Sequence, residues 1–119
     1  MERRKRAGNY GEAAAKGYLA ALGYDILETR YRCDGGEIDI IAKDGEYLVF
    51  VEVKYRRQVN FGSPAAAVTA SKQRAMATAA WFYLAKNNLA DASCRFDIIE
   101  VFGRENLDIN HIKDAFWAE

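Results

Sequence analysis

The sequence predicts one α/β domain, in which a mixed central β-sheet of four or five strands is flanked by helices. Three observations lead to this prediction. One helix-like segment opens the chain, three strand-like segments follow it, and a longer helix separates them from one or two final strands. This order is typical of a mixed sheet with helices packed against it. The 119 residues suit a single domain, over 1–119, with one hydrophobic core.

Composition and charge narrow the class of protein. The chain is 50% hydrophobic and 29% charged, which is ordinary for a globular domain. No apolar run is long enough to span a membrane, and the basic N-terminal segment lacks the apolar core of a signal peptide. We therefore expect a cytoplasmic protein that does not enter a membrane. The formal net charge of +0 argues against an indiscriminate nucleic-acid binder, although the charges are unevenly distributed.

The first helix is predicted over residues 9–22. Apolar and small side chains recur there with helical spacing, and Gly23 follows as a C-terminal cap. Asn9 is a candidate N-cap, and Glu12 completes a capping-box pattern with it. Glu12 could also supply a carboxylate to a site on the sheet if this helix end lies beside it, and both roles stay open. Residues 1–8 are rich in Arg and Lys, and we expect a flexible basic terminus there.

Three strands are predicted after this helix. The first covers 24–32, and the turn Cys33-Asp34-Gly35-Gly36 leads to the second and third, over 37–42 and 47–54. The last two form a hairpin around Asp44-Gly45, because Asp-Gly between runs of β-branched and aromatic residues is typical of a type I′ turn.

The predicted register divides the hairpin into an apolar and a polar face. With Asp44-Gly45 at the centre of the turn, Asp39 pairs with Phe50 and is a diagonal neighbour of Glu52. Side chains alternate along each strand, so one face is almost purely apolar and is predicted to be core: Ile38, Ile40, Ala42, Tyr47, Val49, Val51 and Val53. The other face becomes charged away from the turn and carries Glu37, Asp39, Ile41, Leu48, Phe50, Glu52 and Lys54.

Asp39 and Glu52 are therefore candidate metal ligands. Burying like charges together is costly unless a cation compensates them. Mg²⁺ suits this need, because it prefers oxygen ligands and usually takes one or two carboxylates together with water and substrate phosphate. Lys54 could orient or deprotonate a water molecule, or neutralise charge that develops on a phosphate.

The same charges have a second interpretation, a solvated sheet edge with an ordinary Glu52–Lys54 ion pair worth about 0–1 kcal/mol. The surroundings of Glu52 favour a functional role. It lies within Leu48-Val49-Phe50-Val51-Glu52-Val53, and a strand that is apolar on both faces is usually buried. A charged residue at such a position is expected to have a function.

The second long helix is predicted to begin near Thr69 or Ser71 and to end at about Lys86. Its small and apolar residues predict close packing on the sheet through a buried stripe of Ala75, Met76, Ala79, Ala80, Tyr83 and Leu84. Lys72 lies in the first turn, where the helix dipole disfavours a cation, and this favours an anionic ligand beside it.

The final strands are predicted over 94–102 and 107–117, the second of them at an edge. His111 lies in the second strand without a ligand pattern around it, and we expect a structural role. Cys33 and Cys94 lack the spacing of a zinc site, so we expect two free thiols.

Basic residues continue from the candidate site along the chain. The segment 54–74 contains five basic and no acidic residues. Such a segment beside an acidic cluster suits an enzyme that acts on phosphodiesters, because Arg and Lys hold the phosphate backbone while carboxylates hold a metal. The loop over 55–64 is basic and aromatic and could contact substrate. We expect contacts to nucleic acid from Arg32, Arg56, Arg57 and Lys72.

Asp39 followed by Glu52-Val53-Lys54 resembles the PD-(D/E)xK nuclease signature. A longer series of matches resembles the YraN-like family of small bacterial predicted endonucleases and covers nearly the whole chain: Gly11-Glu12, Gly36-Glu37-Ile38-Asp39, Phe50-Val51-Glu52-Val53-Lys54-Tyr55-Arg56, Phe61-Gly62, Lys72 and Arg95-Phe96-Asp97. Two positions depart from the pattern. Ile38 replaces the proline of the signature's name, and Arg30 stands where asparagine is expected.

The resemblance implies a restriction-endonuclease-like core, related to archaeal Holliday-junction resolvases, that cuts DNA with Mg²⁺ or Mn²⁺. Under it, Asp39 and Glu52 would be metal ligands, Lys54 the catalytic lysine and Glu12 an additional acid, while Glu37 would support the site. Branched DNA is among the implied substrates, and the related resolvases suggest a homodimer.

A different class of function is a non-catalytic nuclease-fold module that binds nucleic acid or a partner protein. The near-zero net charge suits it, or a dimer that pools two basic loops. The complete Asp/Glu/Lys set argues against it, because a pure binder has no need of buried like charges. A metal-free structural subunit is a third reading, with less support than the other two.

Overall fold

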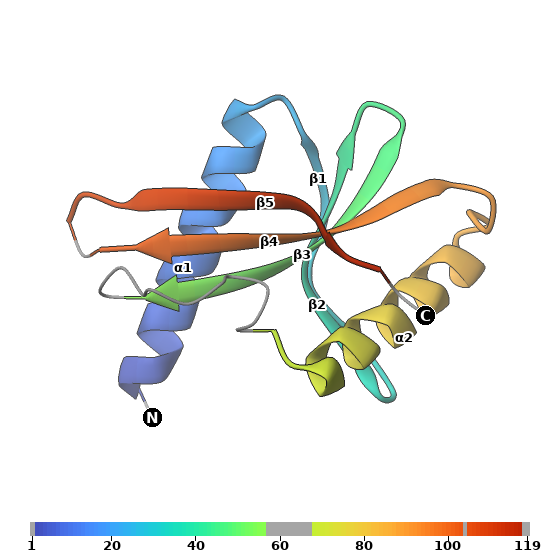
Figure 1. Cartoon of the computed structure of the whole chain (residues 1–119), viewed down its shortest axis with the longest axis horizontal. Coiled ribbons are helices and arrows are strands. Elements are labelled where there is room, and N and C mark those ends of the chain that lie inside the picture. The colour runs from blue at the N-terminus through green and yellow to red at the C-terminus, as the bar shows by residue number, and fades with distance from the viewer. Residues whose placement is uncertain (1, 57–67, 104, 118–119) are drawn as a thin grey trace.

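The structure is a computed structural model that describes residues 2–56, 68–103 and 105–117, with side chains described from Tyr10 onward. Five strands form one sheet in the order β1-β2-β3-β4-β5. Neighbouring strands are antiparallel, except that β3 and β4 are parallel and are connected through α2 (Figure 1). The elements are, in chain order, α1 (Glu2–Ala21), β1 (Asp25–Cys33), β2 (Gly36–Asp44), β3 (Tyr47–Arg56), α2 (Ala70–Lys86), β4 (Ser93–Phe102) and β5 (Asp108–Phe116).

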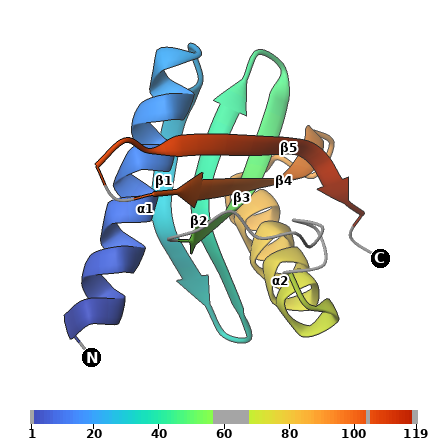
Figure 2. The ribbon, with the colours of Figure 1, turned by 60° about the vertical axis from the view of Figure 1, so that its left-hand side comes forward.

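The two helices cover opposite faces of the sheet (Figure 2). Leu19 of α1 packs with Val49 and Val51, whereas Met76 of α2 packs with Phe50. Because consecutive side chains of β3 point to opposite faces, these contacts define two core layers with the sheet between them. The α/β class and the mixed sheet flanked by helices are confirmed, and the arrangement is consistent with a restriction-endonuclease-like core.

The β2–β3 hairpin forms with a register two residues away from the predicted one. Gly45 and Glu46 are the turn residues. Gly45 has a φ of +57° and Glu46 has no positive φ, which fits a type II′ turn and not the predicted type I′ turn. A shift of two residues leaves every side chain on its face. Continued past the last pair, Ile40 with Val51, this register places Asp39 across from Glu52 and not from Phe50.

The predicted apolar face is interrupted at both ends. Pairing between β2 and β3 ends at Ile40 and Val51, and the two strands separate beyond that point. Ile38 consequently leaves the face under α1 and packs under α2 with Met76. Tyr47, at the turn, is 48% exposed and does not belong to the core. The prediction of one continuous apolar face was therefore wrong at these two residues.

Helix α1 begins at Glu2 and not near Asn9. Asn9 lies inside the helix, so the predicted N-cap and its capping box with Glu12 were wrong. Residues 2–8, predicted as a flexible terminus, are the first turns of the helix. Their Glu, Arg and Lys residues are good helix formers, and this outweighs the capping signal at Asn9. The helix ends before Gly23, which has the predicted left-handed conformation with φ +92°.

Helix α2 begins as predicted. Thr69 is its N-cap, and its Oγ1 accepts a hydrogen bond from the backbone N–H of Lys72 at 3.1 Å. The helix lies directly on Gly36, where a Cβ atom would come within 2.7 Å of the carbonyl oxygen of Ala75 and the backbone nitrogen of Ala79. Glycine is therefore required for this close approach. The predicted buried stripe is confirmed at Met76, Ala79, Ala80 and Tyr83.

The last two strands are confirmed, with β5 at the edge of the sheet. His111 of β5 takes part in a buried polar network under α1. Its Nε2 lies 2.7 Å from Oδ2 of the fully buried Asp97, and its Nδ1 lies 3.1 Å from the hydroxyl of Tyr18. An ionised Asp97 accepts a hydrogen bond from the Nε2–H group of a neutral His111. Nδ1 then accepts a hydrogen bond from the hydroxyl group of Tyr18. This arrangement agrees with the expected structural role.

Cys33 and Cys94 are free thiols, as predicted. Neither helix in the described part of the chain has the length and apolar character that a membrane crossing would need.

Candidate active site

Asp39 and Glu52 meet where β2 and β3 separate. The backbone N–H of Val53 donates a hydrogen bond to Oδ2 of Asp39 at 2.8 Å. The Asp39 side chain thus satisfies a backbone donor beyond the last residue of β3 that pairs with β2. The hydrogen bond holds the Asp39 carboxylate close enough to Glu52 to affect its ionisation. The structure therefore brings together the two residues predicted as metal ligands.

Glu52 is buried, with an exposed fraction of 2%. Burial raises the pKa of Glu52 to about 8, and the neighbouring Asp39 carboxylate acts in the same direction. Lys72 and Lys54 lower this pKa and offset only part of the rise. Oε1 of Glu52 is buried without a hydrogen-bond partner among the described residues. The carboxylate is thus costly to ionise unless a further cation is close.

Lys54 extends from the same strand and the same face as Glu52. Its Nζ lies 3.5 Å from Oε2 of Glu52, and its side chain is 35% exposed. The ammonium group can therefore contact the carboxylate and solvent at once, which is the position expected for a group that meets a substrate phosphate.

Glu37, the predicted supporting residue, is held between two cations. Nζ of Lys72 lies 2.5 Å from its Oε1, and Nε of Arg32 lies 3.8 Å from its Oε2. The hydrogen bond from Lys72 is the main cause that lowers the pKa of Glu37. Lys72 also lies 3.6 Å from Oε1 of Glu52. The anionic ligand that the sequence suggested for Lys72 is therefore provided within the protein by two carboxylates.

Arg56 has an internal partner that the sequence did not indicate. Its Nε donates to Oε2 of Glu100 at 3.0 Å, and Asn110 donates to Oε1 of the same residue at 3.2 Å. Glu100 is 4% exposed and lies beside Lys54 in the parallel β3–β4 pairing. The signal that revealed Glu52 was also present here, because Glu100 interrupts the apolar run 98–101.

Glu12 lies on α1 and pairs with Arg30, whose Nε is 3.2 Å from Oε2. The described residues contain no group of three or more His, Cys, Asp or Glu side chains placed to hold one ion. The structure therefore does not bring Glu12 into a common ligand group with Asp39 and Glu52. The pairing with Arg30 gives a role to the residue that departs from the expected asparagine.

Two predicted contacts cannot be placed. Arg57 and most of the loop over 55–64 lie outside the residues that the structure describes. Of the predicted nucleic-acid contacts that are described, Arg32 is the most exposed, with 76% of its side chain accessible.

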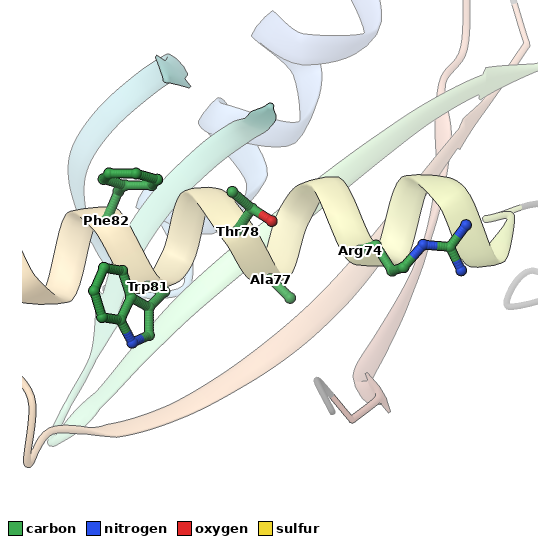
Figure 3. Close-up of a pocket in the computed structure, with 5 residues that line it drawn as sticks. All are labelled: Arg74, Ala77, Thr78, Trp81 and Phe82. Atoms are coloured by element: carbon green, nitrogen blue, oxygen red, sulfur yellow. The ribbon is translucent and has the colours of Figure 1, made fainter. Parts of the chain in front are cut away.

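A pocket of about 410 Å³ is lined by side chains of α2 (Figure 3). Trp81 and Phe82 line it together with Arg74, Ala77 and Thr78. Their spacing places these residues on the helix face opposite to Lys72. The pocket contains no predicted site residue, and nothing in the structure indicates what would cover it.

The fold and the site define a mixed α/β protein in which a buried glutamate, Glu52, lies beside the partly buried Asp39 and two lysines. The chain matches the model of the uncharacterised protein family UPF0102 over residues 11–101, and it belongs to that family. This is the family expected from the YraN-like resemblance.

Relatives in this family match the chain over almost its whole length. A UPF0102 protein of Geotalea daltonii is 49% identical over 114 residues, which cover 94% of this chain and 90% of the relative. A UPF0102 protein of Caldicellulosiruptor saccharolyticus is 44% identical over 116 residues, with 95% and 98% covered. One of Clostridioides difficile is 46% identical over 112 residues, with 94% and 97% covered.

Proposed function

We propose that this protein is a divalent-metal-dependent endonuclease that hydrolyses DNA phosphodiester bonds. One observation carries the proposal: the buried Glu52 carboxylate lies beside Asp39 and within 3.5 Å of Lys54, at a point where two strands separate. A buried carboxylate next to a second carboxylate is expensive to maintain, and the nearby ammonium groups offset only part of this cost. Their chemistry suits a metal and a phosphate, which supports membership of the PD-(D/E)xK nucleases.

The donor set fits Mg²⁺ or Mn²⁺. Both carboxylates offer hard oxygen ligands, and Oε1 of Glu52 lacks a hydrogen-bond partner among the described residues. Two protein ligands are sufficient, because Mg²⁺ usually completes its shell with water and substrate phosphate. A bound ion would supply an activated water molecule and would neutralise charge on the phosphate.

Each residue of the site would then have a separate role. Asp39 and Glu52 hold the ion, and the Val53 N–H keeps Asp39 in place. Lys54 faces the phosphate, where its ammonium group neutralises the charge that develops as water attacks in line. Hydrolysis of this kind requires no covalent bond between protein and DNA.

DNA is the proposed substrate, and branched intermediates of recombination or repair are included. Arg32 and Lys54 expose enough of their side chains to reach a phosphate backbone. Arg56 and Lys72 already have internal carboxylate partners, so a contact with DNA would compete with those pairs. A homodimer is part of the proposal, and the mass of the protein in solution tests it.

The test is a cleavage panel of junction, flap, duplex and single-stranded DNA, each with Mg²⁺ and with Mn²⁺. Wild type should cut at least one substrate. Asp39→Ala, Glu52→Ala and Lys54→Ala should each abolish the cutting, and circular dichroism should show an intact fold. Wild type that cuts no substrate with either ion would refute the enzymatic function.

A second candidate is a non-catalytic module that binds nucleic acid or a protein, which the net charge of +0 and the internal pairing of Arg56 and Lys72 leave open. Calorimetric titration of Mg²⁺ into wild type and Asp39→Asn separates the two. A binding heat that is lost in the variant supports the metal site, and an absence of heat in both supports the module.

A further inference from the structure

Glu52 is flanked by two lysines that come from different elements. Lys54 belongs to β3, the strand that also carries Glu52, so its position follows from that of Glu52 itself. Lys72 comes from α2, and its Nζ lies 3.6 Å from Oε1 of Glu52, the oxygen without a hydrogen-bond partner among the described residues. Lys72 therefore approaches the part of the carboxylate that a metal ion would use.

The fold places Lys72 there against the preference of its own helix. Lys72 lies in the first turn of α2, where the helix dipole disfavours a positive charge, and that turn contains no acidic residue. The position is fixed by the Thr69 cap and by the close contact of α2 with Gly36. A cation at this point gains its stabilisation from the sheet and not from the helix.

Two carboxylates are available to this one ammonium group. Glu37 lies at 2.5 Å and about half of its side chain is exposed, whereas Glu52 lies at 3.6 Å and is almost completely buried. The stronger contact is thus with the outer carboxylate. Lys72 can give up Glu52 and still keep a charged partner.

We infer that Lys72 occupies, in the metal-free site, the side of Glu52 that a divalent ion would take, favours the ionised carboxylate there, and remains on Glu37 alone once the ion binds. This inference rests on the proposed function, because it requires a metal at Asp39 and Glu52. It gives the site a built-in competitor that stabilises the acidic pair in the absence of metal and weakens metal binding.

Loss of the Lys72 charge should change the metal affinity of the site in one direction only. Removal of a competing positive charge within about 4 Å of a ligand should strengthen metal binding. A lysine that stays with Glu37 and does not approach Glu52 in solution would leave the metal affinity of the folded protein nearly unchanged. A lysine that serves only to bind the phosphate of DNA would also leave it unchanged when DNA is absent.

The first experiment is calorimetric titration of Mg²⁺ and of Mn²⁺ into wild type and Lys72→Met without DNA. We expect the variant to bind the ion about tenfold more tightly. The titration is run at several pH values up to about 9, and the affinities are compared where they stop changing with pH, because Lys72 lowers the pKa of Glu52 and its removal would let protons compete more strongly. Lys86→Met is the matched control, because it removes the same charge from the last turn of the same helix. Its metal affinity should equal that of wild type.

The second experiment measures thermal unfolding of the same proteins in chelator and in saturating Mn²⁺. Lys72→Met should lower the melting temperature in chelator, and saturating metal should remove most of this difference. If the lysine is only structural, the difference persists at all metal concentrations. Lys72→Gln, which keeps a hydrogen-bond donor for Glu37, replaces Lys72→Met if the latter does not fold.

The outcomes separate this inference from the proposed function. Equal or weaker metal binding by Lys72→Met, with metal binding and DNA cleavage by wild type, overturns the inference alone. An absence of metal binding in both proteins overturns the inference and the metal-dependent function together. Tighter binding by Lys72→Met, with Lys86→Met unchanged, supports the inference.

Discussion

Glu52 is the residue on which the proposed chemistry depends most. Its carboxylate is nearly inaccessible to solvent, and its neighbours include one acid and two lysines. In the metal-free protein burial is the largest effect on its ionisation, and it opposes the negative charge. The energetic cost of the site is therefore concentrated in this side chain, and it should be measurable as a dependence of stability on pH.

The stability of the metal-free protein should fall as pH rises through the range in which Glu52 ionises. Its pKa is about 8 in the folded protein, above the ordinary 4.5, so its contribution is complete below about 4.5 and is lost as pH rises through about 8. Glu52→Gln cannot ionise and should escape this loss. The difference in free energy of unfolding between the two proteins should grow by a few kcal/mol, in order of magnitude, from pH 5 to 8.

Urea unfolding in chelator at several pH values measures this difference. Parallel stability curves for wild type and Glu52→Gln would show that Glu52 keeps an ordinary pKa and would contradict the described environment of its carboxylate.

Asp97 is the most deeply buried acid, and we assign it to stability. Burial alone would raise the pKa of Asp97, but hydrogen bonds from His111, Arg95 and the backbone of Asp114 outweigh it and lower the pKa. Asp97→Asn would remove the buried charge that Arg95, His111 and the Asp114 N–H share, and Arg95 would keep only its ion pair with the partly exposed Asp44. We expect a loss of about 3–5 kcal/mol in the free energy of unfolding, measured with urea.

Asp108→Asn, at an exposed position of β5, is the control for this substitution and should change stability by less than about 0.5 kcal/mol. A similar loss in both variants would mean that the buried network contributes no more than a surface charge does.

At the scale of elements, the contact between α2 and β2 positions the site. Gly36→Ala would place a methyl group 2.7 Å from backbone atoms of Ala75 and Ala79, and backbone atoms do not move as readily as a flexible side chain. We expect a loss of about 1–3 kcal/mol in the free energy of unfolding. Metal-dependent cleavage should also weaken, because Gly36 begins β2, the strand that carries Asp39.

Gly17→Ala is the matched control on α1, where an added Cβ atom would meet nothing within 4 Å. Alanine there should stabilise the helix by about 0.5–1 kcal/mol, since glycine is a poor helix former. Equal effects of the two substitutions on stability would contradict the close packing of α2 on Gly36.

The elements show why their existence could be predicted more readily than their ends. Periodicity of apolar residues located both helices and all five strands, because burial depends on which face a side chain occupies. The start of α1 and the hairpin turn depend on competition between local signals. Asp-Gly favoured one turn, and the chain adopted the neighbouring one at Gly45-Glu46. The two-residue error in register did not change which site residues were predicted to lie together, because Asp39, Glu52 and Lys54 stay on the same face of the hairpin.

At the scale of the whole molecule, the candidate site could be predicted in part. Asp39, Glu52 and Lys54 could be grouped because they share one hairpin, where alternation fixes the geometry. The partners of Lys72, Arg56 and Glu12 could not be predicted from the sequence. Each partner lies on a different element from the residue it contacts, and only the assembled sheet and helices determine which carboxylate or cation is near. The sequence resemblance pointed to the right family, whose function its name leaves open.

The most direct test of the proposed function is the cleavage of DNA by wild type and by Glu52→Gln, side by side, with Mg²⁺ and a four-way junction or duplex as substrate. Glutamine keeps the size of the side chain and removes the charged ligand. We predict that wild type cuts in a Mg²⁺-dependent manner and that Glu52→Gln, folded and able to bind the same DNA, does not. Equal cutting by both proteins would contradict the proposed role of the acidic pair, and cutting by neither would contradict the nuclease function.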